Sequence, residues 1–382
     1  MTSAAAQPLH AQIRNSVLRQ IDDGTLRPGD RLPSESEIMR QYSVSRGTVT
    51  RALRDLEVKG VLRRQRGLGT FVREPEDNAK GDLAQPLTFA LFTAWAGVGQ
   101  SVGSFHMQLL HGLSRIGADH HATIFLQTLS PRHGETHRDQ VLAAAKALVA
   151  RKPQVVLYCA LELPHDEMGL NVEALEVFED AGIDVAVVDR DILPYPERSK
   201  YPWISFDNRR GGMLVTQHMA DQGYERVAFV SIEKDSTAVF ERQSGYHDAV
   251  RAIGLPSDDE LVIVSNDQPT EDDLDRILAA RPDSIVCKDA YMAATIGMML
   301  SRRGIEIGTQ MGLAGFDDDP IAALLPVPLT VVRQPIDLFA AATFDVATMI
   351  ASGDGPGTQL TSMGSRIVLP VELIPRESTV RR

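Results

Sequence analysis

The residues best suited to binding chemistry lie in a short segment near the N-terminus that has the periodicity of a helix. Residues 45–56 place apolar side chains on one face, and the first turn presents Arg46, Gly47, Thr48 and Thr50. Arginine can donate two hydrogen bonds to a guanine edge, and short hydroxyls and glycine permit close approach to DNA. The backbone amides of a helix N-terminus also favour phosphate. This combination predicts a helix that reads the major groove of DNA.

The elements around this segment predict a domain that could position it. Apolar spacing predicts a first helix over 9–21, and a capping box at Ser34 and Glu37 opens a second helix. Ser45 caps the third helix, and two strand-like runs then flank residues 65–69 to form a hairpin with a basic tip. Three helices followed by a basic hairpin are typical of a winged helix-turn-helix, whose third helix enters the major groove.

The charge distribution supports a nucleic-acid partner for this part of the chain only. The sequence of 382 residues has a formal net charge of −12. Residues 1–73 hold 13 Lys and Arg against 7 Asp and Glu, whereas the remainder holds 26 against 44. A polar stretch with two prolines separates the two parts. We therefore predict a DNA-binding domain over 1–73, a linker over 74–86 and a larger, acidic domain over 87–382.

The run LRPGDRLPSESEIMRQYSVSRGTVTRALRDLEVKGVLRRQRGLGTFV, within residues 8–73, resembles the DNA-binding domain of the GntR family of bacterial transcription regulators. The resemblance implies DNA contacts from the first turn of the third helix and from the wing tip. At one contact position, where relatives often carry Arg, this chain has Ser36. The DNA-binding residues predicted from pattern and resemblance together are Ser34, Ser36, Ser45, Arg46, Gly47, Thr48, Thr50, Arg51, Arg66 and Gly67.

The larger domain alternates apolar runs with helical segments, a pattern typical of parallel sheets covered on both faces. The predicted strands are 88–92, 123–126, 155–158, 185–188, 227–230, 262–264, 284–287, 312–316 and 330–332. The predicted helices include 105–115, 141–150, 212–222, 274–280 and 291–302. We therefore predict an α/β fold of two doubly wound lobes, with a ligand at the carboxyl ends of the strands.

Six segments in this domain resemble, in order, the effector domain of the LacI/GalR family, which is similar to periplasmic sugar-binding proteins. They are VAVVDRDI, SFDNRRGGMLVTQHMADQGYERVAFV, FERQSGYHDAV, SIVCKDAYMAATIGMML, GLAGFDDDP and TVVRQPIDLFAAA. The likeness covers residues 87–375, and joined to a GntR head it resembles the arabinose-repressor subfamily. It implies that a sugar or related small molecule is held between the lobes.

Sugar hydroxyls are recognised by planar carboxylate, amide and guanidinium groups, and aromatic rings cover the apolar face of the sugar. Arg242, placed just before a helix of the second lobe, and Asp317 are the strongest candidates for such contacts. Aromatic walls are expected from Trp95 or Phe105. The full predicted effector set is Trp95, Phe105, Asp189, Arg190, Asn208, Arg242, Lys288, Asp289, Phe316, Asp317 and Gln334.

Lys288 departs from the pattern, because relatives commonly carry Asn immediately before the aspartate that follows this strand. A lysine replaces an amide by a fixed positive charge. One interpretation is an anionic effector, a sugar acid or sugar phosphate, whose charge pairs with Lys288 and Arg242. The other is an ion pair from Lys288 to Asp289 or Asp317 within the cleft.

Other functions find weaker support in the sequence. The glycines of 97–103 miss a dinucleotide fingerprint by one residue, and no P-loop or H-E-x-x-H occurs. His133 and His137 are expected to be solvated, as are Asp318 and Asp319 in a turn before Pro320. We therefore expect no cofactor, no metal and no enzymatic activity. The alternative is an intracellular sugar- or nucleotide-binding α/β enzyme with an accessory DNA-binding head.

These features together predict a ligand-responsive transcription regulator, most simply a repressor. Two heads of a symmetric dimer would bind a pseudo-palindromic operator, and a carbohydrate-type effector between the lobes would change operator affinity. The N-terminus has no basic-then-apolar signal pattern, and no stretch approaches the roughly 20 apolar residues of a membrane span. A soluble, cytoplasmic protein without a membrane partner is expected.

Overall fold

The computed structural model describes most of the chain in separate stretches. They are residues 9–22, 24–27, 29–42, 44–58, 61–65, 69–72, 86–93, 104–129, 136–161, 169–193, 197–233, 236–266, 268–352 and 365–381. Contacts divide the chain into two compact units, Met1–Pro86 and Leu87–Arg382. Most of the predicted linker, residues 74–85, lies outside the described stretches. Each unit is described by itself below.

The first unit contains the predicted helices and hairpin. They are α1 (Leu9–Asp22), α2 (Glu35–Tyr42), α3 (Arg46–Val58), β1 (Leu62–Gln65) and β2 (Gly69–Val72), with β1 and β2 antiparallel. The apolar face predicted for the third helix is buried in the core, together with Ile13, Ile38 and Leu62. The backbone amide of Ser34 donates to the Glu37 carboxylate at 2.7 Å, and the Glu37 amide donates to Ser34 Oγ at 3.3 Å. The predicted capping box is therefore present.

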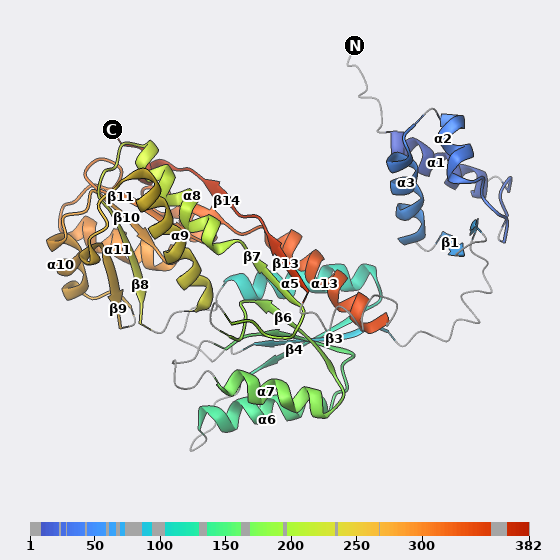
Figure 1. The fold of residues 1–382 in the computed structure, drawn as a ribbon, viewed down its shortest axis with the longest axis horizontal. Helices are drawn as coiled ribbons and strands as arrows, with labels where there is room; N and C mark the ends of the chain where they lie inside the picture. The colour runs from blue at the N-terminus through green and yellow to red at the C-terminus, as the bar shows by residue number, and fades with distance from the viewer. Residues whose placement is uncertain are drawn as a thin grey trace, which may run out of the picture. The chain divides into compact units, whose positions relative to one another are not determined.

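The second unit consists of two lobes, each built on a six-stranded sheet of described residues (Figure 1). In lobe one the strands lie in the order β13 (Arg366–Leu369), β7 (Trp203–Phe206), β6 (Asp184–Asp189), β5 (Val155–Cys159), β3 (Thr88–Thr93) and β4 (Thr123–Thr128). In lobe two the order is β14 (Glu372–Ile374), β12 (Thr330–Arg333), β11 (Gly312–Phe316), β10 (Ser284–Cys287), β8 (Val227–Ile232) and β9 (Val262–Ser265). Neighbouring strands are parallel except β12 and β14.

Helices cover both faces of each sheet, because each strand is apolar on both sides. In lobe one, α5 (Ser104–Asp119) and α13 (Ile336–Ser352) pack on one face, and α6 (His137–Val149) and α7 (Gly169–Asp180) on the other. In lobe two, α8 (Asn208–Asp221) and α9 (Thr237–Ile253) pack on one face. The other face of lobe two carries α10 (Glu271–Ala279), α11 (Ala290–Arg302) and α12 (Pro320–Leu324). The predicted α/β fold of two doubly wound lobes is confirmed.

Every predicted strand lies in an observed strand, but β7, β13 and β14 were not predicted. All of them are at most four residues long, and β13 and β14 lie at sheet edges. They matter because they carry the chain between the lobes. Within the described residues the chain crosses three times: from β7 to α8, from β12 to α13 and from β13 to β14. Among these residues, no helix is long and apolar enough to cross a membrane.

The tightest helix contact in lobe two is the crossing of α8 and α9, which depends on two glycines. A Cβ atom at Gly212 would overlap the carbonyl oxygen of Arg242, and one at Gly245 would overlap that of Arg209. The backbones can approach this closely only because neither position has a side chain. The crossing thereby sets the distance between Asn208, at the start of α8, and Arg242 on α9.

We predict that Gly245→Ala lowers the free energy of unfolding by about 2–4 kcal/mol, because the added methyl group forces the two helices apart. Gly169→Ala is the matched control, since Gly169 opens α7 and an added Cβ would have no atom within 4 Å beyond its chain neighbours and the nearby backbone of its own helix. That control should be neutral or slightly stabilising. Urea unfolding followed by circular dichroism measures both variants, and equal stabilities would contradict the role of the crossing.

Candidate functional site

In the first unit, the N-terminus of α3 presents small polar groups to solvent. Ser45 and Gly47 are exposed, and Thr48 and Thr50 are partly exposed. Ser45 Oγ accepts from the Thr48 amide at 3.4 Å and lies 3.0 Å from Thr48 Oγ1. The predicted cap on the third helix is therefore present, and its first turn is open to a ligand.

The wing is held to the rest of this unit by backbone pairing with the segment before α2. The Gly29 amide donates to the Val72 carbonyl at 2.9 Å, and the Leu32 amide donates to the Thr70 carbonyl at 2.8 Å. This pairing fixes the base of the hairpin beside α2. The side chains of Ser36, Arg46 and Arg51, and the whole of Arg66 and Gly67, lie outside the described residues.

In the second unit, Arg242 is the centre of the largest cluster of predicted effector residues. Its guanidinium donates to Asn208 Oδ1 at 3.0 Å and to the Lys288 carbonyl at 2.7 Å, and it pairs with Asp317 Oδ1 at 3.3 Å. It also lies 4.5 Å from the ring centroid of Phe316. Arg242 is only 5% exposed. A buried guanidinium is tolerated because its donors and its π face are satisfied in this way.

The position of Arg242 corrects the expectation that it precedes a helix. It lies within α9, which begins at Thr237 after the N-cap position Ser236. As a result the guanidinium emerges from a rigid helix and not from a loop.

The partners of Arg242 come from strand ends on one edge of the lobe-two sheet. Lys288 and Asp289 follow β10, and Asp317 follows β11, while Asn208 follows the crossing from lobe one. Asp289 caps α11 through the Met292 amide at 2.8 Å and accepts from Lys288 Nζ at 2.6 Å. Of the two interpretations of Lys288, the structure contains the ion pair to Asp289.

Asp189 and Asp317 occupy equivalent places in the two lobes. Each lies at the carboxyl end of the third strand in the order given above, β6 in lobe one and β11 in lobe two. Both have a positive φ, which is 75° for Asp189 and 68° for Asp317. Non-glycine residues with positive φ are strained and concentrate at functional sites. Arg190, next to Asp189, donates from Nε to the Ala160 carbonyl at 2.9 Å.

The carboxyl groups in this region differ in the direction in which their pKa values are shifted. Burial raises the pKa of Asp317, and the charge of Arg242 only partly offsets it, while Asp289 and Asp189 add to the rise. Burial also raises the pKa of Glu241, which was not predicted as a site residue. Burial would raise the pKa of Asp289 too, but Lys288, the Met292 amide and Arg242 together outweigh burial, so this pKa is lowered.

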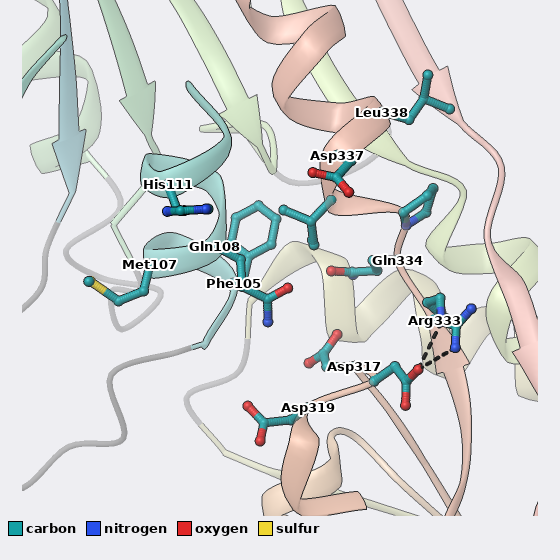
Figure 2. Close-up of a pocket in the computed structure, with 13 residues that line it drawn as sticks. Phe105, Met107, Gln108, His111, Asp317, Asp319, Arg333, Gln334, Asp337 and Leu338 are labelled. Atoms are coloured by element: carbon teal, nitrogen blue, oxygen red, sulfur yellow. Dashed lines mark hydrogen bonds and ion pairs between the residues drawn. The ribbon is translucent and has the colours of Figure 1, made fainter. Parts of the chain in front are cut away.

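A cavity of about 640 Å³ opens between the lobes beside this cluster (Figure 2). The predicted residues Phe105, Asp317 and Gln334 line it. Lobe one contributes α5 and the start of α13, and lobe two contributes the turn after β11 and the end of β12. Gln108 and His111 also line it and were not predicted, although they follow Phe105 at intervals of three residues on α5. Trp95 lies outside the described residues.

The turn after β11 is not solvated, contrary to expectation. Asp318 accepts from Arg333 Nε at 2.8 Å and from Arg376 Nη2 at 2.6 Å, and its side chain is 15% exposed. Asp319 is buried and caps α12 by accepting from the Ile321 amide at 3.0 Å. Both aspartates are therefore structural parts of the cavity wall, which spacing alone did not reveal because Arg376 is 58 residues away in sequence.

Metal and nucleotide sites receive no support from the described part of the chain. There, no group of three or more His, Cys, Asp and Glu residues is placed to hold a metal ion. The glycine-rich segment 97–103 and His133 lie outside that part. His137 opens α6 and is exposed.

Comparison with known proteins identifies both units. Residues 9–72 match the model of the gntR family of bacterial regulatory proteins, and residues 216–379 match a periplasmic binding protein-like domain. The chain joins a GntR-family DNA-binding domain to a LacI-type, periplasmic-binding-protein-like domain. It is therefore a DNA-binding regulator and not an enzyme.

Several regulators match this chain over most of their own length. The arabinose metabolism transcriptional repressor of Halalkalibacterium halodurans is 23% identical over 85% of this chain and 84% of its own. The HTH-type transcriptional regulator GalR of Salmonella typhimurium is 24% identical over 86% and 92%. The solved complex of the transcriptional regulator CelR with cellobiose has a TM-score of 0.63 at 20% identity, covering 91% of this chain and 100% of that one. The predicted family resemblance and fold are confirmed.

We predict that Arg242→Lys lowers the free energy of unfolding by about 2–3 kcal/mol, although the charge is kept, because an ammonium cannot reach all three acceptors at once. Arg251→Lys is the matched control, since Arg251 lies on the same helix and pairs with Asp248 in an exposed position. Its effect should stay within about 0.5 kcal/mol. Denaturant unfolding of both variants measures the difference, and equal losses would contradict a central role for Arg242.

Proposed function

We propose that this regulator is a repressor whose affinity for operator DNA is controlled by a neutral sugar bound between the two lobes. The observation that carries the proposal is the cavity between the lobes, where Asp317, held by the buried Arg242, faces Gln334 and Phe105. Relatives support the class of ligand. One is named for arabinose metabolism, and solved structures with this fold contain cellobiose or D-xylulofuranose.

The chemistry of the cavity suits hydroxyl groups. Asp317 keeps 32% of its side chain exposed, so one carboxylate oxygen can accept from sugar hydroxyls while the other faces Arg242. Gln334 supplies both a donor and an acceptor, and the Phe105 ring offers an apolar surface. We infer that Asp189 and Arg190 approach the same ligand from lobe one when the lobes close.

The charges favour a neutral sugar over a sugar acid or phosphate. Lys288 is paired with Asp289, Arg242 with Asp317, and Arg333 with Asp318. The described lining of the cavity contains four aspartates, Asp317, Asp318, Asp319 and Asp337, against one arginine. An anion would therefore face a lining with more carboxylates than cations, and the cations named above already have partners.

The regulatory mechanism follows from the crossings between the lobes. A sugar that contacts both lobes binds more tightly to the closed form and shifts the population towards it. In a symmetric dimer the shift would change how two heads fit a pseudo-palindromic operator, with the first turn of α3 and the wing on the DNA. The change in operator affinity is limited to the difference in sugar affinity between the two states. Such a regulator acts on the chromosome, in the cytoplasm.

A thermal-shift screen of the full chain tests the class of effector. Neutral pentoses, hexoses and disaccharides, including arabinose and cellobiose, are compared with their sugar acids and phosphates. A ligand at 100 times its Kd stabilises the native state by about 2.7 kcal/mol, so a neutral sugar should raise the melting temperature by several degrees.

Lys288→Asn provides the decisive variant of this screen. We expect it to leave the shift caused by the neutral sugar nearly unchanged, because Lys288 is engaged with Asp289. A sugar acid or phosphate that stabilises the wild type but not Lys288→Asn would instead assign the lysine to an anionic effector. Stabilisation by none of these compounds would contradict a sugar effector altogether.

The dimer surface is proposed on α11 and α12, which pack against each other in lobe two. Tyr291, Met298 and Leu324 leave apolar surface exposed there, and Leu324 is 80% exposed. Exposed apolar groups on neighbouring elements mark interaction sites. Because α12 follows the turn of Asp317, a movement at the ligand would reach this surface directly.

We predict that Leu324→Arg weakens dimerisation at least about tenfold, because a charge would be buried against the second copy. Phe240→Arg is the matched control: Phe240 is 55% exposed on α9 of the same lobe. Sedimentation velocity of both variants over a concentration series checks this. A dimer unaffected by Leu324→Arg, or lost equally in Phe240→Arg, would contradict this surface.

A further inference from the structure

The cavity wall contains a triad of charged side chains that are paired with one another. Asp318 is shared by Arg333, from the end of β12, and Arg376, from the C-terminal segment after β14. Arg333 donates from Nε at 2.8 Å and from Nη2 at 2.7 Å to the same carboxylate oxygen, and Arg376 binds the other oxygen at 2.6 Å. Both oxygens of Asp318 are therefore engaged.

The turn that carries Asp317 needs such support. Asp317 has a φ of 68°, a left-handed backbone conformation that is unfavourable for a residue with a side chain. The Asp317 amide donates to the Val332 carbonyl at 3.0 Å, and the Asp319 amide donates to the Asp317 carbonyl at 2.8 Å. A strained turn persists only where surrounding contacts over-determine it. Asp318, the next residue, supplies such contacts. Its side chain binds Arg333 at the end of β12 and Arg376 in the C-terminal segment.

Arg376 is itself fixed by several bonds. Its amide donates to Thr330 Oγ1 at 2.8 Å, and its Nη1 donates to the Leu329 carbonyl at 2.7 Å. Beyond it, Ser378 Oγ accepts from the Thr330 amide at 2.8 Å and donates to the Leu313 carbonyl at 2.6 Å. The tail is thus bonded to β11 and β12, the two strands whose ends carry Asp317 and Gln334.

The triad also bears on the second crossing between the lobes. Arg333 directly precedes Gln334, and both line the cavity (Figure 2). Arg333 Nη1 further lies 3.6 Å from Glu372 on β14, which follows the third crossing. The Asp318 carboxylate therefore links the two segments that carry proposed sugar contacts. These are the turn with Asp317 and the crossing with Gln334.

We propose that Arg376, acting through Asp318, is a positioning residue of the effector site that sets the geometry of Asp317 and Gln334 without touching the ligand. The proposal rests on the proposed sugar site between the lobes. The C-terminal segment, which is remote in sequence from the site, would thereby control the affinity of the site for the sugar.

The test compares Arg376→Met, which removes the charge, with Arg376→Lys, which keeps it. Arg303→Met is the matched control, since Arg303 forms an exposed pair with Glu271 and Asp275 in the same lobe. The probe is the neutral sugar with the largest thermal shift in the screen, titrated calorimetrically at a temperature where every variant is folded. Operator affinity without sugar and hydrogen–deuterium exchange of residues 315–320 are measured in parallel.

We expect Arg376→Met to weaken sugar binding at least about fivefold and to speed exchange of residues 315–320, with operator affinity unchanged in the absence of sugar. Arg376→Lys should restore part of the sugar affinity, and Arg303→Met should behave as wild type. Wild-type sugar affinity and exchange in Arg376→Met would overturn the proposal and leave the sugar site intact. A wild-type chain that binds no sugar would overturn the proposed function, and exchange of 315–320 would still decide whether Arg376 holds the turn.

Discussion

Burying a guanidinium is unfavourable unless the protein supplies acceptors for its hydrogen bonds and a partner for its charge. On the effector side of lobe two, several elements supply these partners for Arg242. Each of its partners lies on a different element: Asn208 at the start of α8, Lys288 after β10 and Asp317 after β11. The ring of Phe316 covers its face. Loss of any one partner would leave the charge of Arg242, or that of Asp317, incompletely compensated. The same contacts that stabilise the lobe therefore hold a carboxylate ready for a ligand.

This arrangement depends on backbone features remote from the charge. The glycines at the crossing of α8 and α9 bring Asn208 and Arg242 within hydrogen-bonding distance. The parallel sheet brings the ends of β10 and β11 to one edge, as in other open α/β sheets with a ligand at that edge. Asp318 and two arginines hold the turn after β11 in place. The site is thus held in place by the crossing of α8 and α9, by the ends of β10 and β11, and by the C-terminal segment.

Much of this could be predicted from the sequence. Apolar runs of β-branched residues marked the central strands, and the turn and capping signals marked the helices of the DNA-binding unit. Short edge strands such as β13 and β14 escaped prediction because three or four residues carry too little periodicity. Asp318 was misjudged for a different reason. A run of three aspartates before a proline has the composition of a solvated turn, and nothing local indicates that Arg333 and Arg376 fold back onto it. Residue spacing could not predict contacts between segments that are far apart in the sequence.

We infer that occupancy of the cavity between the lobes controls binding to DNA. Fluorescence anisotropy tests this with a duplex that the full chain has selected from a random pool, with and without a saturating neutral sugar. We expect the sugar to change the Kd for DNA at least about tenfold in the wild type. Asp317→Asn should bind the same duplex with little response to that sugar. If a sugar binds between the lobes and leaves the Kd for DNA unchanged, the cavity does not control DNA binding.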